Sequence, residues 1–138
     1  MITLRKKQPT VTAEKALHIV IADDVHEIVE LVRGWLEEAG HTVTCAANGR
    51  DVMRLLREKS FDVLITDIVM PEGDGWDAIL AVNRLRPATR ILAISGGGRN
   101  MPADACLRVA KGVGADQILK KPFNRAQLIA ALHQVSPR

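Results

Sequence analysis

The stretch LHIVIADD, at residues 17–24, sets the fold class of this chain of 138 residues. Its first six residues form a short, nearly continuous apolar run, which is typical of a strand buried on both faces of a parallel sheet. Directly after Asp23 and Asp24 the apolar residues take up helical spacing, in a segment that we expect to end at Gly40. A buried strand followed at once by an amphipathic helix is the repeating unit of α/β proteins.

The same unit recurs four more times along the chain. The later strands are predicted at residues 41–46, 61–66, 90–94 and 117–120. Asn48 and Asn124 are typical helix caps and predict where the second and fifth helices begin. The fourth helix is expected from about residue 102 to residue 111, broken by Gly112 and Gly114. Five units with short connections predict an α/β fold, in which a doubly wound five-stranded parallel sheet is covered by helices on both sides.

Length and composition fit one globular domain. Hydrophobic residues make up 47% of the chain and charged residues 25%, a balance that disordered proteins do not have. We expect a flexible N-terminal tail at residues 1–15, followed by one domain at residues 16–138 with no second domain. No apolar run is long enough to span a membrane, and the N-terminus lacks the apolar stretch of a secretory signal. We therefore expect a cytoplasmic protein without membrane contact.

The charge and the cysteines point to no special partner. The net charge is +3, and part of it comes from the basic residues 5–7 in the predicted tail. The other basic residues form no stripe interleaved with aromatic side chains, so direct binding of nucleic acid is not expected. Cys45 and Cys106 lie far apart in the sequence, and we expect buried thiols rather than a disulfide or a metal site.

Polar side chains follow four of the five predicted strands, at the edge where open parallel sheets bind their ligands. These residues are Asp23, Asp24, Asp67, Ser95 and Lys121. The second strand ends without a comparable group. This exception is explained if the second strand lies at the edge of the sheet, which gives the strand order 2-1-3-4-5.

These residue types favour phosphoryl chemistry with a metal. Three carboxylates in one crevice repel one another, and a hard divalent cation such as Mg²⁺ relieves the repulsion. Lys121 adds a compact positive charge that suits a carboxylate or a phosphoryl oxygen. Ser95 offers a hydroxyl, and Gly96 and the glycines after it leave backbone N–H groups open to an anion. An aspartate in these surroundings is a plausible nucleophile toward phosphorus, forming an aspartyl phosphate.

Four motifs resemble one known family, the receiver domains of two-component signalling. The motifs are IVIADD at residues 19–24, DIVMPEGDG at 67–75, ISG at 94–96 and KPF at 121–123. The resemblance covers nearly all of residues 17–135. It implies a flavodoxin-like (βα)5 fold like that of the chemotaxis signal protein.

The resemblance also implies roles for individual residues. Asp67 is the phosphoacceptor, and Asp24 and Asp67 are direct ligands of Mg²⁺ together with the backbone carbonyl of Val69. Asp23 acts through a coordinated water. Ser95 bonds one phosphoryl oxygen after transfer.

By the same resemblance, Lys121 holds another phosphoryl oxygen. The implied function is that of a stand-alone, single-domain response regulator, phosphorylated by a histidine kinase or a phosphotransfer protein. It signals by contact with an unknown downstream protein or by onward phosphorelay. It is not a turnover enzyme, and at most dephosphorylates itself slowly.

The chain departs from the family pattern in two places. Many members have an aromatic residue three positions before the lysine, where this chain has Ile118. The segment Gly96–Gly98 replaces the alanine that is common after the hydroxyl residue, and leaves the approach to the fourth helix free in backbone conformation. We expect that helix to be displaced or mobile.

Three other functions fit the sequence less well. A flavin-binding protein of this fold needs a phosphate loop after the first strand, where this chain has two aspartates that repel phosphate. An aspartate-based phosphatase usually has a second acid two residues after its nucleophile, where this chain has Val69. A docking module without phosphorylation would not need the full set of residues that is present.

Overall fold

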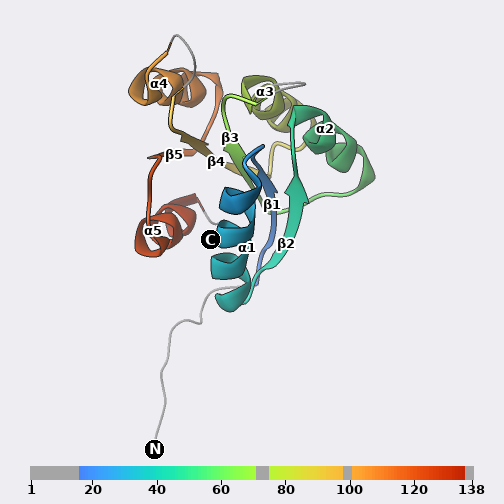
Figure 1. Ribbon diagram of the computed structural model, residues 1–138. Helices are drawn as coiled ribbons and strands as arrows, with labels where there is room; N and C mark the ends of the chain where they lie inside the picture. The colour runs from blue at the N-terminus through green and yellow to red at the C-terminus, as the bar shows by residue number, and fades with distance from the viewer. Residues whose placement is uncertain (1–15, 71–74, 98–100, 136–138) are drawn as a thin grey trace, which may run out of the picture.

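Strands and helices alternate five times in the computed structural model, which describes residues 16–70, 75–97 and 101–135 (Figure 1). The strands are β1 (His18–Ala22), β2 (Thr42–Ala46), β3 (Val63–Asp67), β4 (Arg90–Ser95) and β5 (Gln117–Lys120). The helices are α1 (His26–Glu38), α2 (Gly49–Glu58), α3 (Gly75–Leu85), α4 (Ala103–Val113) and α5 (Arg125–Val135). The predicted tail at residues 1–15, most of the turn at 71–74, and Gly98 lie outside the described residues.

The five strands form one parallel sheet in the order β2-β1-β3-β4-β5, which confirms the predicted order. The register brings the carboxyl ends of neighbouring strands level with one another. Asp67 at the end of β3 pairs with Ile94, and Ser95 at the end of β4 pairs with Lys120. Residues that follow these strands therefore meet at one edge of the sheet.

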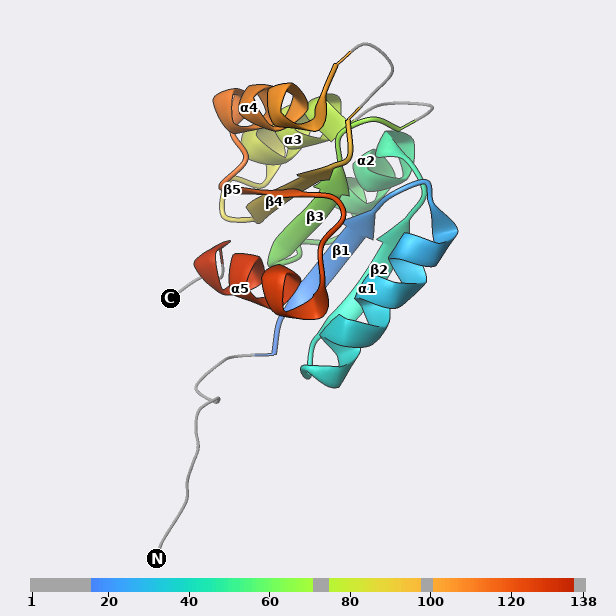
Figure 2. The same cartoon turned by 60° about the vertical axis from the view of Figure 1, so that its left-hand side comes forward.

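Helices cover both faces of the sheet, as Figures 1 and 2 show. Alternate strand residues feed two separate cores, since successive side chains of a strand point to opposite faces. Ile19 and Ile21 of β1 pack on the side of α1 and α5. Val20 and Ala22 pack on the side of α2, α3 and α4. Burial on both faces explains why the central strands appear in the sequence as continuous apolar runs.

Both predicted caps are present. The Asn48 side chain accepts a hydrogen bond of 2.9 Å from the backbone N–H of Asp51 at the start of α2. Asn124 and Gln127 form a reciprocal pair at the start of α5, in which each side chain accepts a 2.8 Å bond from the other residue's backbone N–H. These bonds satisfy N–H groups that have no partner within the helix.

The fourth helix ends two residues later than predicted, and of the two glycines expected to break it only Gly114 does so. Gly112 lies inside α4, and the helix ends only at Gly114, whose φ of +121° is a left-handed conformation. A glycine inside a helix costs about 1 kcal/mol relative to alanine, which is too little to end a packed helix. The positive φ at Gly114 does end it, because side chains other than glycine rarely adopt that conformation.

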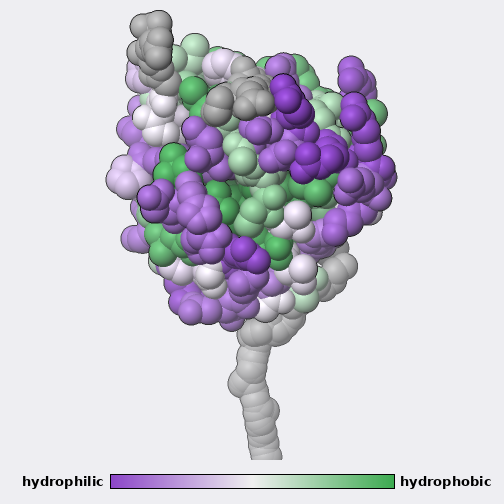
Figure 3. Space-filling view, turned by 45° about the vertical axis from the view of Figure 1, so that its right-hand side comes forward, coloured by the Kyte–Doolittle hydropathy of each residue, from purple (hydrophilic) through white to green (hydrophobic). Residues whose placement is uncertain are grey.

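The side of the molecule that carries β2 and α2 in Figure 1 is brought forward in Figure 3, where hydrophilic side chains surround a strip of more apolar ones. β2 is an edge strand, and its Thr42 and Cys45 are exposed. The expectation of two buried thiols is therefore correct for Cys106 and wrong for Cys45. No helix in the described part of the chain has the length and hydrophobicity that a membrane span requires.

Candidate functional site

The side chains expected at the strand ends come together at the carboxyl edge of the sheet. Asp23 and Asp24 follow β1, Asp67 and Ser95 are the last residues of β3 and β4, and Lys121 follows β5. A backbone hydrogen bond of 2.9 Å from the N–H of Lys121 to the carbonyl of Ser95 extends the β4–β5 ladder to the site. The predicted meeting of the strand ends at one edge is observed, and the roles of the five residues stay predictions.

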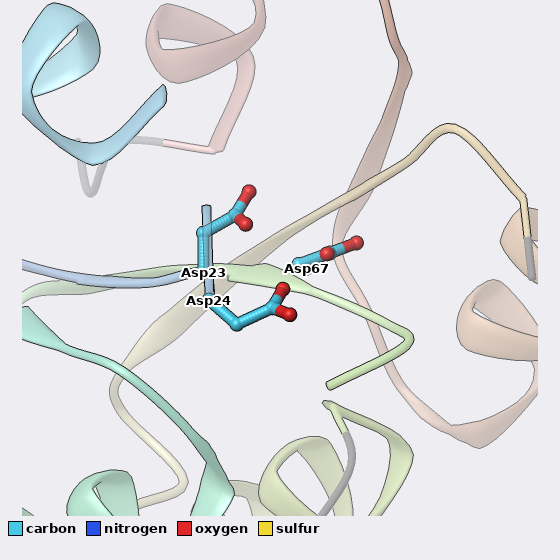
Figure 4. A group of neighbouring side chains, drawn as sticks. All are labelled: Asp23, Asp24 and Asp67. Carbon is cyan, nitrogen blue, oxygen red and sulfur yellow. The ribbon is translucent and has the colours of Figure 1, made fainter. Parts of the chain in front are cut away.

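Three carboxylates form the centre of the site. Asp23, Asp24 and Asp67 each present an oxygen that lies within 4.8 Å of the other two. Figure 4 shows the three side chains extending in the same direction from the strand ends, with the Asp24 carboxylate reaching toward Asp67. Asp23 and Asp67 are buried, with 2% and 6% of their surface exposed, whereas Asp24 is exposed. Water therefore reaches the group from the side of Asp24.

Lys121 supplies the positive charge of the site. Its Nζ lies 2.8 Å from Oδ2 of Asp23 and 3.4 Å from Oδ2 of Asp67. Burial lowers the pKa of Lys121, but this effect is outweighed by the two carboxylates, so the pKa is raised overall. Lys121 therefore stays charged while most of its side chain is buried, with 18% exposed.

Asp23 has one oxygen that is incompletely satisfied. Its Oδ1 accepts a hydrogen bond of 2.9 Å from the N–H of Val25, which fixes the carboxylate. Its Oδ2 is buried, and its close partner among the described residues is the ammonium of Lys121 at 2.8 Å. Such a buried acceptor is expected to gain from a further cationic partner.

Asp67 differs from an ordinary carboxylate in its acidity. Burial and, to a smaller extent, the neighbouring Asp23 raise the pKa of Asp67 to about 6, although Lys121 and the Ile68 N–H act to lower it. That N–H donates a 2.8 Å hydrogen bond to Oδ1, while Oδ2 faces Lys121. A second cation beside Asp67 would lower this pKa and keep the carboxylate ionised at neutral pH.

The residues present fit a magnesium ion. Ligands across such an ion lie about 4 Å apart, close to the spacing of the three carboxylates. The incompletely satisfied Oδ2 of Asp23 and the exposed Asp24 meet the ion's need for oxygen ligands and for several waters. Val69, two residues after Asp67, has an exposed side chain, and the role of its carbonyl as a ligand stays a prediction.

Ser95 is fully buried at the end of β4. Its Oγ accepts a 3.0 Å hydrogen bond from the N–H of Gly97, so its own proton remains available for another acceptor. Gly97 has a φ of +98°, and a Cβ there would lie 3.0 Å from the backbone nitrogen of Ala103. Gly96 is exposed, and its expected contact with an anion stays a prediction.

Ile118 occupies the position at which many members of the resembling family have an aromatic residue. It pairs with Ala93 across the β4–β5 ladder and packs, partly buried, against the core under α2, α3 and α4. The displacement or mobility of α4, and the part of Ile118 in the response, stay predictions.

Two neighbours of Asp67 were missed by the sequence analysis. The hydroxyl of Thr66 is fully buried and donates a 2.9 Å hydrogen bond to the carbonyl of Asp67. The N–H of Gly75 donates a 2.8 Å bond to the carbonyl of Ile68, and a Cβ on Gly75 would collide with the carbonyl oxygen of Asp67. Thr66 could have been noticed as a polar residue inside an apolar run. Gly75 could not be distinguished from an ordinary turn glycine, because only its packing shows the close approach.

Comparisons with known proteins agree with this geometry. A family model described as the response regulator receiver domain matches residues 19–133. The response regulator GtcR of Aneurinibacillus migulanus is 33% identical over 114 residues, which are 83% of this chain and 45% of the relative. SaeR of Staphylococcus aureus matches over 51% of its length, so this chain spans about half the length of the curated relatives it matches.

Among solved structures, the chemotaxis response regulator CheY4 of Vibrio cholerae is 31% identical, with a TM-score of 0.76 over 88% of this chain and 99% of that one. A response regulator from Burkholderia pseudomallei is 27% identical, with a TM-score of 0.73 over 83% of this chain and 65% of that one. Its structure holds a phosphorylated aspartic acid and a calcium ion.

Proposed function

Because this chain belongs to the family of response regulator receiver domains, in which aspartate phosphorylation and Mg²⁺ binding are general features, we propose that Asp67 is its phosphoacceptor. The observation that carries the proposal is the position of Asp67. It ends β3 within 4.8 Å of the oxygens of Asp23 and Asp24 and 3.4 Å from the ammonium of Lys121. A carboxylate placed between a metal site and a fixed cation suits a nucleophile toward phosphorus.

The donor is a phosphohistidine on a histidine kinase or a phosphotransfer protein. A carboxylate oxygen of Asp67 forms the new bond to phosphorus while the bond from phosphorus to the histidine nitrogen breaks, and the histidine leaves with its electron pair. Lys121 neutralises a phosphoryl oxygen, since its ammonium already lies beside Oδ2 of Asp67. The Ser95 hydroxyl turns its free proton toward another oxygen, and the Gly96 N–H faces the same anion.

A magnesium ion held directly by Asp24, Asp67 and the Val69 carbonyl, and by Asp23 through a water, would supply charge neutralisation on the incoming phosphoryl oxygens. The similar Burkholderia pseudomallei protein holds a phosphorylated aspartic acid and a calcium ion, which supports the pairing of the two on this fold. The signal then leaves by contact with a downstream protein or by onward transfer of the phosphoryl group. The domain acts as a phosphoacceptor and not as a turnover enzyme.

Phosphotransfer profiling tests the proposal. The purified histidine kinases of the source organism, each labelled on its histidine, are mixed with the chain for short times. Fast transfer from one kinase to the chain, absent with Asp67→Asn, is the expected result. Transfer to Asp67→Asn at the rate of the wild type would contradict it.

Removal of the exposed metal ligand is expected to weaken both metal binding and phosphorylation. Asp24→Asn removes one of three charges from the site, so the affinity for magnesium should fall about tenfold or more. Asp104→Asn on α4, an exposed aspartate outside the carboxylate group, is the matched control and should change neither property. Calorimetric titration with magnesium measures the affinity. Undiminished phosphorylation in excess chelator would contradict the metal requirement.

The aspartyl phosphate is expected to be long-lived for a receiver domain. Val69 has no polar atom that could orient an attacking water, and Gly97 has no side chain. Val69→Asn should therefore not slow the loss of the phosphoryl group. Val109, which is equally exposed on α4, provides the control, and Val109→Asn should leave the rate of loss unchanged. The decay of phosphorylated protein with time measures the lifetime. A wild-type half-life of seconds, or a clear slowing in Val69→Asn, would count against this expectation.

A further inference from the structure

A hollow of about 410 Å³ lies at the edge of the sheet opposite to the phosphoacceptor site. It is formed by the loop between α2 and β3, the loop between α3 and β4, and the start of β1. Its lining residues are His18, Ser60, Phe61, Asp62, Leu85, Arg86, Pro87, Ala88 and Thr89. Nothing in the phosphoacceptor chemistry uses any of them.

Part of the lining of the hollow is apolar, and it includes the buried Phe61 and the half-exposed Leu85. Phe61 is 5% exposed and meets the His18 ring edge-on, with ring centroids 6.3 Å apart. Leu85, at the end of α3, is 49% exposed although it lines the hollow. An aliphatic or aromatic side chain inserted here would cover apolar surface of Leu85 and Pro87 that now faces water.

The walls are held in place by hydrogen bonds, so binding needs little ordering of the protein. The Thr89 hydroxyl donates a 2.7 Å bond to the carbonyl of Phe61, which joins the two loops. The backbone N–H of Asp62 donates a 2.9 Å bond to the carbonyl of His18. The Arg86 guanidinium donates from Nε and Nη2 to the carbonyl of Leu56 at the end of α2. A preformed hollow loses little conformational entropy on binding.

Positive charge exceeds negative charge around the hollow. Arg86 lines it, Lys59 and Arg84 are the chain neighbours of its lining residues Ser60 and Leu85, and none of these three cations forms an ion pair with a carboxylate of the described residues. The lining also holds one carboxylate, Asp62, whose Oδ2 accepts a 2.8 Å hydrogen bond from the N–H of His18. Cations at helix C-termini are favoured by the helix dipole, and the bonds of Arg86 to Leu56 use only part of its donors. Arg86 Nη1 and the other ammonium and guanidinium groups remain able to pair with an external carboxylate.

We propose that this hollow is a docking site for an acidic segment of a partner protein, which inserts an aliphatic or aromatic side chain between Leu85 and Phe61 and places carboxylates against Arg86 and Lys59. Apolar insertion supplies affinity, and the charges supply orientation and partner choice. The site lies a full strand length from Asp67, and binding is independent of phosphorylation.

The test uses the full chain labelled with ¹⁵N and a blocked peptide, Glu-Glu-Leu-Glu-Glu, as the probe. Amide signals of residues 60–62 and 85–89 should shift in a saturable way, with weakening at higher salt. A peptide with alanine in place of leucine should bind roughly tenfold more weakly, as expected for loss of a buried leucine side chain. A peptide with lysine in place of glutamate should not bind.

Matched variants separate the hollow from the rest of the surface. Leu85→Glu should abolish binding, whereas Leu80→Glu, 51% exposed on the same helix but outside the hollow, should not. Lys59→Glu should weaken binding about threefold or more, whereas Arg108→Glu on α4 should have no effect. Asp67→Asn should bind the peptide as the wild type does. Peptide binding therefore tests the docking site alone, and phosphorylation of Asp67 tests the proposed function alone.

Three results would overturn the proposal. One is the absence of shifts at residues 60–62 and 85–89 with the leucine peptide. Another is equal loss of binding in Leu80→Glu and Leu85→Glu. The third is an equal response to inorganic phosphate alone, which would make the hollow an anion site and not a protein docking site.

Discussion

Gly75→Ala is expected to destabilise the protein by about 3 kcal/mol or more, which corresponds to a fall in melting temperature of roughly 10 °C. A Cβ at this position would collide with the carbonyl oxygen of Asp67 and would lie 2.8 Å from the Cα of Ile68. The obstacle is backbone and not the end of a flexible side chain, so either α3 or the end of β3 must move. Movement of β3 displaces the phosphoacceptor, and phosphorylation should slow as well.

A second glycine in a helix provides the control for this prediction. Gly112 lies in α4, and a Cβ there would meet nothing within 4 Å. Gly112→Ala should therefore leave stability unchanged or raise it by up to about 1 kcal/mol, because alanine is the better helix former. Thermal and urea unfolding of the two variants measure the difference. Equal stability of Gly75→Ala and Gly112→Ala would show that the start of α3 has room for a Cβ beside the backbone of Asp67, and would contradict this prediction.

Asp67→Asn is expected to stabilise the protein by about 2 kcal/mol at neutral pH in the absence of divalent metal. Burial raises the pKa of Asp67 to about 6 in the folded state, above its ordinary value of 3.8. The folded protein therefore resists ionisation of this group more than the unfolded chain does. Asparagine removes the charge, and Lys121 keeps Asp23 as its nearer partner at 2.8 Å.

The sign of the effect sets its pH dependence. Folding favours the protonated form of Asp67, because its pKa is higher in the folded state than in the unfolded chain. Its stabilising contribution to the free energy of unfolding is therefore fully present below pH 4 and is lost as the pH rises to 6 and above. The stability difference between Asp67→Asn and the wild type should therefore be small at pH 4 and grow toward pH 7. Unfolding by urea with chelator present measures it, with Asp104→Asn as the control. A difference that shrinks as the pH rises would contradict the raised pKa.

Magnesium should reduce the difference in stability between Asp67→Asn and the wild type. An ion that binds the folded wild type stabilises it by mass action, whereas a variant that lacks one of the three carboxylates gains less. The wild type should therefore approach the stability of Asp67→Asn as magnesium is added. This comparison separates the charge repulsion among Asp23, Asp24 and Asp67 from any change in packing.

The positions of the central strands could be predicted because of burial. Residues 63–65 of β3 are fully buried on both faces, and burial of that kind leaves a continuous apolar run in the sequence. Asn48 and Asn124 marked helix starts by a local hydrogen bond that depends on nearby residues alone. The end of α4 could not be predicted, because Gly112 and Gly114 differ only in a backbone angle that packing decides.

The members of the site could be predicted, but their electrostatics could not. Parallel strands bring their carboxyl ends to one edge, so Asp23 and Asp67, which follow and end the neighbouring strands β1 and β3, were expected side by side. Lys121 follows β5, two strands away from β3, and the strand order alone does not bring its ammonium to these carboxylates. The sequence does not reveal that Lys121 lies nearer to Asp23 than to Asp67. It also does not reveal the pKa of Asp67, since distances and burial after packing determine both.

The most direct test of Asp67 as the phosphoacceptor is the mass of the chain after incubation with a small phosphodonor and magnesium. The wild type should gain the mass of one phosphoryl group, and fragmentation should place the modification in the peptide that contains Asp67. Asp67→Asn, which is expected to fold at least as stably as the wild type, should gain nothing under the same conditions. A phosphoryl group that persists on Asp67→Asn, or that maps to Asp23 or Asp24, would contradict the assignment.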